Sequence, residues 1–480
     1  MLAGHSGLGL AFAALIYLVC FSGVPAVFVA ELEQWEQPRQ PTVTYASDAA
    51  VTRAAEEGLA RARALGADHS LQLFLPTEDV ARLRVRAVGD DGTDHAWYAD
   101  ENGALTEGVS TPFSDFVAHF HADLHLPEPW GAYLVGLTGV ALLSSLISGV
   151  LSHPRVFRDA FHLRWGGAKR LQEADLHNRI SIWGLPFHIA VSLTGAFLGL
   201  AGLIVTVLAF AAYDGDAGKA VEAVLGPQPG PSEAPAPLPD IAAIRARVLA
   251  MSPGAEGLFV IIEHPGTEGQ VMTYDAIAPG HLAAAERYHF EGDGTFIRTA
   301  GGADGPMGMQ IFAAMSPLHF GTFGGLAVKI AYGLLGLGLC VVTSSGVAIW
   351  LARRRDKGRP APRWERIWIA TVWSQPLAYG AVALAVVGFG LSPVAAWWTA
   401  TAIAVVWGAT RRDAGDTSRQ LRLTGGIALA IGGLVPLLTQ AAFTPIPVAV
   451  GVTILAFACA LGVSSLGKAG SPPSRETANV

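Results

Sequence analysis

Charge is scarce in this sequence, and positive charge shows no excess. Only 15% of the 480 residues are charged, whereas a soluble protein is usually near a quarter charged. Long apolar runs dilute the charged residues, as they do in integral membrane proteins. The formal net charge of −7 offers no basic surface, which excludes nucleic acid as a partner.

Cysteine is scarce, and nucleotide-binding glycine motifs are absent from the sequence. Cys20, Cys340 and Cys459 all fall inside apolar runs, and no pair has the spacing of a metal site or a disulfide framework. No Cys-x-x-Cys-His is present, which excludes covalent c-type haem. No Gly-x-Gly-x-x-Gly stands between a strand and a helix, so we expect no flavin or nicotinamide domain.

Eight apolar runs are long enough to span a bilayer as helices of about 20 residues. We expect the first run to be a retained helix rather than a signal peptide, because nothing basic precedes it and it is longer than a signal core. The last four form a block over 367–466. The runs are 8–29, 130–151, 183–212, 326–351, 367–390, 394–410, 421–440 and 446–466.

Basic residues set the predicted orientation. Lys and Arg concentrate in four segments. These are the loops 152–182 and 352–366, the connector that follows the sixth run, and the tail 467–480. The positive-inside rule makes all of these cytoplasmic, so both termini lie inside. The acidic connector 30–129 and the connector 214–325 then lie outside.

Both long connectors predict the same small α+β module. A helical pattern over 49–65 precedes alternating, strand-like segments in the first connector, and a helical pattern over 241–251 precedes them in the second. The expected fold is therefore a mainly α membrane protein with about eight transmembrane helices and two α+β modules on the outer side. The predicted segments are helix 1 at 1–29, module 1 at 30–129, helix 2 at 130–151, helix 3 at 183–213, module 2 at 214–325 and helix 4 at 326–351.

Helix, module and helix occur twice in residues 1–355, with a period of about 175 residues, and histidines repeat with them. His5 and His177 stand at the predicted cytoplasmic ends of helices 1 and 3, and His121 and His319 at the outer ends of helices 2 and 4. Each histidine is followed along its helix by a small residue and a glycine. These glycines are Gly23, 18 positions after His5; Gly195, 18 after His177; Gly149, 28 after His121; and Gly346, 27 after His319.

This arrangement predicts two haem sites. A neutral imidazole is a common iron ligand, and two on facing helices can hold a b-type haem. A helix rise of 1.5 Å per residue carries Gly23 roughly 27 Å from His5, to the depth of the opposite pair, where a small residue leaves room for a flat macrocycle. The plainer interpretation is interfacial histidines and close helix packing at glycine.

Other histidines are alternatives. His188 lies 11 positions after His177, on almost the same helical face and inside an apolar run, so it is a second candidate for the inner ligand or a proton-relay group. His125, one turn after His121, is a second candidate at the outer end. His153 and His162 lie in a basic loop, where a solvated surface is the favoured interpretation.

The histidine segments resemble a known family, the bacterial PepSY-associated transmembrane-helix proteins, which include iron-regulated inner-membrane proteins and ferric-siderophore reductases. The resemblance covers about residues 1–355. It implies periplasmic PepSY modules and, in the siderophore-reducing members, haem, with His5, His121, His177 and His319 at the matching positions. The stretches that carry it are His5-Ser6-Gly7-Leu8-Gly9 with Ser22-Gly23; His121-Ala122-Asp123-Leu124 with Gly131 to Gly136; His153 to Arg164 with Asp175-Leu176-His177-Asn178 and Thr194-Gly195; and Leu318-His319-Phe320-Gly321.

The four C-terminal helices contain no histidine. Their notable side chains are Gln375, Gln440, Trp397 and Trp398, for which packing and an interfacial aromatic belt are favoured over a quinol site. A permease is disfavoured because coupling ions usually need a charged residue within the helices.

The resulting hypothesis is an inner-membrane protein in the lipid bilayer that holds two b haems. It would pass electrons from a quinol or a cytoplasmic reductase to a periplasmic ferric siderophore or other ferric chelate, as a ferric-siderophore reductase. The rival is a regulator whose PepSY modules bind or inhibit a periplasmic peptidase, without haem.

Overall fold

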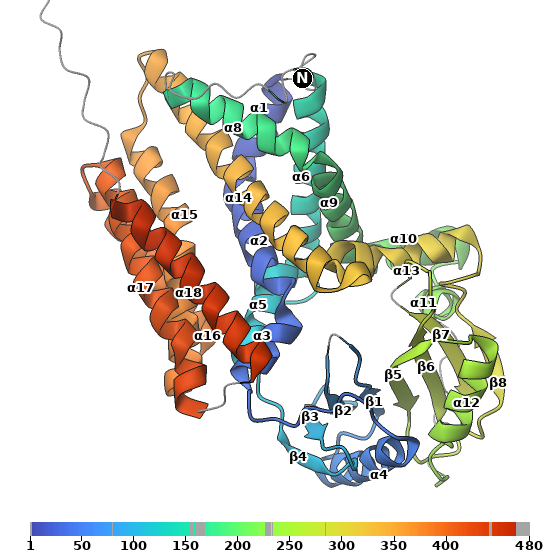
Figure 1. Ribbon diagram of the computed structural model, residues 1–480. Helices are drawn as coiled ribbons and strands as arrows, with labels where there is room; N and C mark the ends of the chain where they lie inside the picture. Colours follow the sequence, from blue (N-terminus) through green and yellow to red (C-terminus); the bar gives the residue numbers. More distant parts are fainter. Residues whose placement is uncertain are drawn as a thin grey trace, which may run out of the picture.

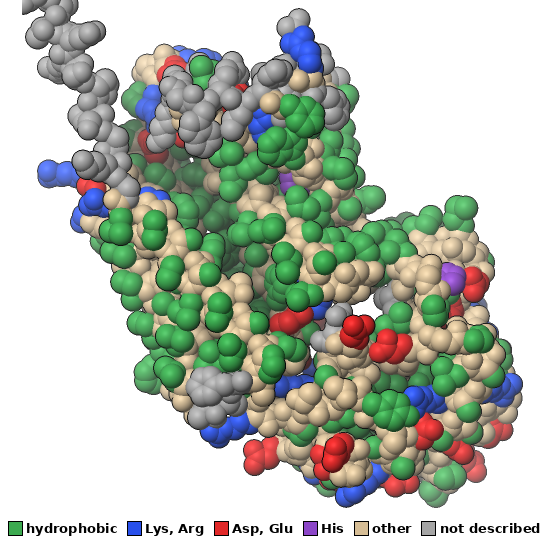
Figure 2. Space-filling model, viewed as in Figure 1, with side chains coloured by type: hydrophobic (Ala, Val, Ile, Leu, Met, Phe, Trp, Pro, Cys, Tyr) green, Lys and Arg blue, Asp and Glu red, His purple; other side chains and the backbone are tan. Residues whose placement is uncertain are grey.

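The computed structural model describes residues 2–78, 80–152, 158, 161, 169–225, 232, 234–283, 285–440 and 444–466. A helical bundle carries a separate β-sheet region at one end (Figure 1). The N-terminus lies at the opposite end of the bundle. Hydrophobic side chains cover the middle of the bundle, whereas charged side chains gather at its upper end and over the sheet region (Figure 2). This distribution is that of a multi-pass membrane protein with a polar domain on one side.

The described residues hold five helices long and apolar enough to cross a membrane, or seven when two bent pairs each count as one span. This is fewer than the eight predicted. Helix α14 (Gly325–Asp356) is longer than the predicted run 326–351. The five are α6 (Trp130–Ser152), α14 (Gly325–Asp356) with the preceding turn η1 (Thr322–Gly324), α15 (Pro362–Ala383) with η2 (Leu384–Gly388), α17 (Ala414–Gln440) and α18 (Pro445–Leu466).

The two bent pairs are α1 (Leu2–Ala11) with α2 (Ala13–Ala26), bent by 65°, and α8 (Lys169–Trp183) with α9 (Leu185–Gly199), bent by 70°. The sixth predicted run forms α16 (Pro393–Thr410), which is long enough but is outside the set of candidate spans.

The third predicted helix, 183–213, corresponds to two helices in the structure. Helix α9 begins after the bend at Gly184 and ends at Gly199, and α10 (Ala201–Ala212) then leaves the bundle direction (Figure 1). The loop predicted at 152–182 is also partly wrong, because residues 169–182 form most of α8. An apolar run shows which residues avoid water, but it does not show where the helix axis turns.

The sheet region is one antiparallel sheet of eight strands rather than two separate modules. The two predicted modules join where β1 pairs with β5, from Ser70 opposite Glu263 to Phe74 opposite Phe259. The strand order is β4-β3-β2-β1-β5-β6-β7-β8. The strands are β1 (Ser70–Phe74), β2 (Leu83–Val88), β3 (Asp94–Ala99), β4 (Leu105–Gly108), β5 (Glu256–Glu263), β6 (Val271–Ile277), β7 (Glu286–Glu291) and β8 (Phe296–Thr299).

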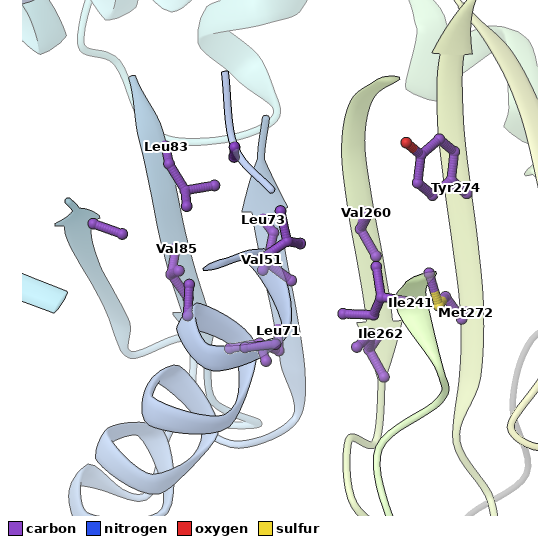
Figure 3. Packing of buried hydrophobic residues seen from close by; sticks show 14 of the residues in the cluster. Val51, Leu71, Leu73, Leu83, Val85, Ile241, Val260, Ile262, Met272 and Tyr274 are labelled. Carbon is purple, nitrogen blue, oxygen red and sulfur yellow. The ribbon is translucent and has the colours of Figure 1, made fainter. Parts of the chain in front are cut away.

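One hydrophobic core runs under the whole sheet. The helices α4 (Asp48–Leu65) and α12 (Ile241–Met251) pack beside each other on it, close to the predicted 49–65 and 241–251. The side chain of Ser47 accepts a hydrogen bond from the Ala50 amide and starts α4, and Gly66 ends it at φ 68°. Buried side chains from both halves meet in this core (Figure 3), among them Val51, Leu71, Leu73, Val85, Ile241, Val260, Ile262 and Met272.

Short helices connect the sheet to the bundle. Two of them carry predicted site histidines: α5 (Pro112–Asp123) and α13 (Met307–Phe320). The others are α3 (Val29–Glu36) and α11 (Ala217–Leu225). The C-terminal helices α15 to α18 pack on one another, and their core continues onto Trp35 of α3 and Phe116 of α5.

Candidate functional site

Four helices bring the predicted histidines together in two pairs. His5 of α1 and His177 of α8 lie with their ring centroids 6.4 Å apart and their planes at 72°. His121 of α5 and His319 of α13 lie with their centroids 5.9 Å apart and their planes at 23°. We call these the inner pair and the outer pair. Helices α1 and α8 stand at the N-terminal end of the bundle, whereas α5 and α13 stand at the end that carries the sheet (Figure 1).

A backbone carbonyl or a hydroxyl fixes the tautomer of each imidazole. A carbonyl oxygen only accepts, so an imidazole Nδ1 at hydrogen-bond distance from it carries the proton. The Thr194 hydroxyl donates to the Ala190 carbonyl at 2.7 Å, so it accepts from His319 Nδ1 at 3.0 Å. The other Nδ1 bonds run from His5 to the Ser145 carbonyl at 2.9 Å, from His121 to the Val19 carbonyl at 3.0 Å, and from His177 to the Val342 carbonyl at 2.9 Å.

The remaining nitrogen, Nε2, is therefore left with its lone pair in all four rings. Within the described residues, no hydrogen bond to Nε2 of these histidines is found. An imidazole that donates through Nδ1 to a carbonyl and offers Nε2 is the usual form of a metal-ligating histidine, because the bond at Nδ1 orients the ring.

The four predicted glycines lie against the imidazole rings. An added Cβ at Gly23 would stand 2.9 Å from Cε1 of His121, and one at Gly195 would stand 2.8 Å from Cε1 of His319. At the inner pair the clearances are slightly larger, 3.2 Å between Gly149 and His5 and 3.3 Å between Gly346 and His177. The glycines make room for the histidine ring itself, on the side where its Nδ1 is held.

The duplication is visible in this geometry. Each glycine receives the histidine of the other helix in its own repeat, and each pair then takes one histidine from each repeat. The carbonyl bonded by His5, His121 or His177 belongs to the residue four positions before the glycine of that site. One local motif, a small residue and glycine with a carbonyl one turn earlier, is therefore used at three of the histidines, and at His319 the Thr194 hydroxyl beside Gly195 takes the place of the carbonyl.

A cavity of about 360 Å³ adjoins the inner pair. Helices α1, α6, α8 and α14 line it, and both His5 and His177 contribute to its wall together with Gly149 and Gly346. Its deeper wall is mostly aliphatic, with Leu142, Leu146, Ile182 and Val347 among the lining residues. This is space for a largely apolar group between two imidazoles.

The residues fit a haem better than a bare metal ion. Two metal–imidazole bonds in line, each of about 2 Å, hold the ring centroids roughly 6 Å apart, close to the 6.4 and 5.9 Å found here. Among the described residues, no three His, Cys, Asp or Glu side chains converge as a metal-ion site. A haem iron takes four ligands from its macrocycle and needs only two from the protein.

His188 and His125 occupy other positions. His188 is fully buried at the bend between α8 and α9, against Gly184, and is not part of the cavity wall. Its ring faces the carbonyls of Ser181 and Leu335 without hydrogen-bond geometry. His125 donates a hydrogen bond from Nε2 to the Phe116 carbonyl at 3.1 Å, and its ring stacks on Phe116. His153 and His162 lie outside the described residues.

The polar residues of the C-terminal helices are used internally. The buried Gln375 accepts a hydrogen bond from the Trp397 indole at 3.1 Å and donates to Ser374 at 3.1 Å. Trp398 is exposed, as an interfacial aromatic residue would be. The side chain of Gln440 lies outside the described residues. Gln375 therefore supports the packing interpretation.

Glu36 is a site residue that sequence reasoning missed. Its carboxylate accepts hydrogen bonds from the amides of Phe113 and Ser114 and from the Ser114 hydroxyl, at 2.8, 2.9 and 2.9 Å. It thereby caps the N-terminus of α5, the helix that carries His121. Burial raises the pKa of Glu36 to about 7. No local pattern signals this contact, because 77 positions separate Glu36 from Phe113.

The bundle, its apolar surface and its duplicated helices define a multi-pass membrane protein. The model of the PepSY-associated TM region family matches residues 2–353, and the chain belongs to that family. It is 31% identical over 316 residues to the uncharacterized protein PA4219 of Pseudomonas aeruginosa, an alignment that covers 62% of this chain and 78% of the relative. The family match ends in the last turns of α14, so α15 to α18 lie beyond it.

Proposed function

We propose that this protein is a b-type dihaem protein of the inner membrane that carries electrons across the bilayer to reduce a ferric siderophore or another ferric chelate on the outer side. The observation that carries the proposal is the double pairing of histidines. Two pairs stand at opposite ends of one bundle, and all four rings hold the proton at Nδ1 and offer Nε2.

A b-type haem at each pair would supply one-electron redox chemistry. His5 and His177 would hold one, and His121 and His319 the other. The chain's own contribution is rigid orientation: the carbonyls of Val19, Ser145 and Val342 keep the imidazoles from rotating. The glycines keep backbone close to each ring, so neither water nor a bulky side chain competes for the space.

The direction of transfer is supported by charge. Arg353, Arg354 and Arg355 end α14 on the side of the inner pair, and arginines in short loops mark the cytoplasmic side. The sheet region then stands outside, next to the outer pair, where a chelate would arrive. Hard oxygen donors of chelates bind Fe(III) better than Fe(II), so reduction would release the iron. The choice of a ferric substrate follows the family resemblance.

An absorption spectrum of the purified protein tests the proposal. We expect a Soret band with split, low-spin bands on dithionite reduction, at about two haems per chain. His319→Ala should remove the bis-histidine signature of one haem, while the matched control His281→Ala, an exposed sheet-region histidine paired with Asp304, should retain both. A preparation without a Soret band, even after haem supplementation, would contradict the proposal; a peptidase co-purifying with such a preparation would favour the regulatory alternative.

A further inference from the structure

Three consecutive arginines end helix α14, and only one of them lines the inner cavity. Arg354 stacks on the Trp350 ring at 5.2 Å, and Arg355 pairs with Glu365 at 2.8 Å. Arg353 contributes to the cavity wall instead. Among the described residues, no carboxylate lies within ion-pair distance of Arg353. It is the one of the three whose charge is turned to the cavity.

The position of Arg353 along α14 places it at the mouth of the cavity. Gly346, which faces His177, is seven residues earlier on the same helix. Seven residues are about two turns and roughly 10 Å, so both residues stand on the same face of α14.

The cavity is amphipathic from its depth to its mouth. The deeper part is lined mainly by aliphatic side chains, and the hydroxyls of Ser145 and Thr343 there already have partners within the protein. Arg353, Ser152 and Asn178 add polar side chains to the wall. Ser152 is the last residue of α6, at the same end of the bundle as Arg353. A ligand that fits this cavity is flat and apolar over most of its area and carries negative charge along one edge.

We infer that Arg353 is the residue that recognises the carboxylates of the porphyrin in the inner cavity and sets which edge faces the cytoplasm. The inference rests on the proposed function and extends it to the specificity of the inner site. A guanidinium presents a planar fork of donors that matches a carboxylate. Arg353 gains an ion-pair partner when the porphyrin carboxylates lie at the mouth of the cavity. The opposite orientation is disfavoured because the carboxylates would then be buried against aliphatic side chains without a partner.

The test compares two porphyrins that differ only in charge. Haem-free protein carrying His121→Ala and His319→Ala retains the inner pair alone, and is titrated in detergent with hemin or with hemin dimethyl ester while the Soret band is followed. Hemin should bind about three- to tenfold more tightly than the ester, as expected for one partly solvated charged pair. Arg353→Met should lower hemin affinity to that of the ester and leave ester affinity unchanged, and Arg353→Lys should restore part of the preference. Arg355→Met is the matched control and should keep the full preference.

Two outcomes overturn the assignment while leaving the proposed function intact. In one, hemin and its ester bind the inner pair equally well. In the other, Arg353→Met discriminates between them as strongly as the parent protein does. Binding of neither porphyrin by the inner-pair protein overturns the assignment, and the absence of haem binding by the wild-type protein as well overturns the proposed function.

Discussion

The Cα of Gly23 faces the imidazole of His121 so closely that a methyl group on it would stand 2.9 Å from Cε1. The same ring is held on its Nδ1 side by the Val19 carbonyl, one helical turn before Gly23. The ring therefore has no room to retreat without breaking the hydrogen bond that fixes its tautomer.

Gly23→Ala is expected to weaken the outer site. The added methyl must push the His121 ring away from the Val19 carbonyl, because Gly23 is inside α2 and its backbone is not free to move. We expect haem at the outer pair to fall by at least half, measured as Soret absorbance per chain. Gly7→Ala is the control, since a Cβ there meets nothing within 4 Å. Full haem content in Gly23→Ala would contradict the assigned contact.

The inner ligand is expected to be His177 rather than His188. His177→Ala should remove the inner haem, because His177 faces His5 across the cavity. His188→Leu should retain both haems, because His188 fills the bend at Gly184 and lies outside the cavity wall. Haem content and the low-spin electron paramagnetic resonance spectrum distinguish the two variants. Loss of one haem in His188→Leu, with His177→Ala unaffected, would reverse the assignment.

Stability is expected to fall as the pH rises from 4.5 to about 7. Burial raises the pKa of Glu36 to about 7 from its usual 4.5, so between these values the folded protein holds a proton that the unfolded chain has lost. The bound proton makes its whole contribution to the free energy of unfolding at pH values below the pKa of the unfolded chain. That contribution, up to about 3 kcal/mol, is lost as the pH rises through 7. Thermal unfolding in detergent should show this slope, and Glu36→Gln should flatten it. A slope that persists unchanged in Glu36→Gln would assign the pH dependence to other groups.

The two halves of the sheet are expected to unfold together. Leu73 is fully buried in the core that both halves share, next to the β1–β5 junction. Leu73→Ala should destabilise the sheet by about 2–5 kcal/mol, and hydrogen exchange should accelerate in β5 to β7 as well as in β1 to β3. Gln72→Ala, at the neighbouring position on the opposite face of β1, should change exchange little. Faster exchange confined to β1 to β4 would mean two independent modules.

The histidine pairs could be predicted from the sequence because they follow from repetition. The 18-position spacing of His5 to Gly23 recurs from His177 to Gly195, and a repeated spacing on helices fixes relative depth without knowledge of the contacts. The helix at 241–251 could also be predicted from its helical pattern, and α12 spans Ile241–Met251.

Other features depend on contacts between distant segments and were not predictable. The β1–β5 pairing joins residues about 190 positions apart, and either strand alone is indistinguishable from the edge of a separate module. The chain bends by 70° at Gly184, and α8 packs on α14 before the bend, a contact that the apolar pattern does not record. The Glu36 cap on α5 is likewise a tertiary contact.

The crossing of the two repeats within each histidine pair has a consequence for biosynthesis. His5 leaves the ribosome long before His177, and His121 long before His319, so a nascent chain that ends anywhere before residue 319 holds at most one complete pair. Any ligand that requires both imidazoles must wait for the later helix to be inserted into the membrane. The inner pair is therefore completed before the outer pair during translation, and the two sites assemble in that order.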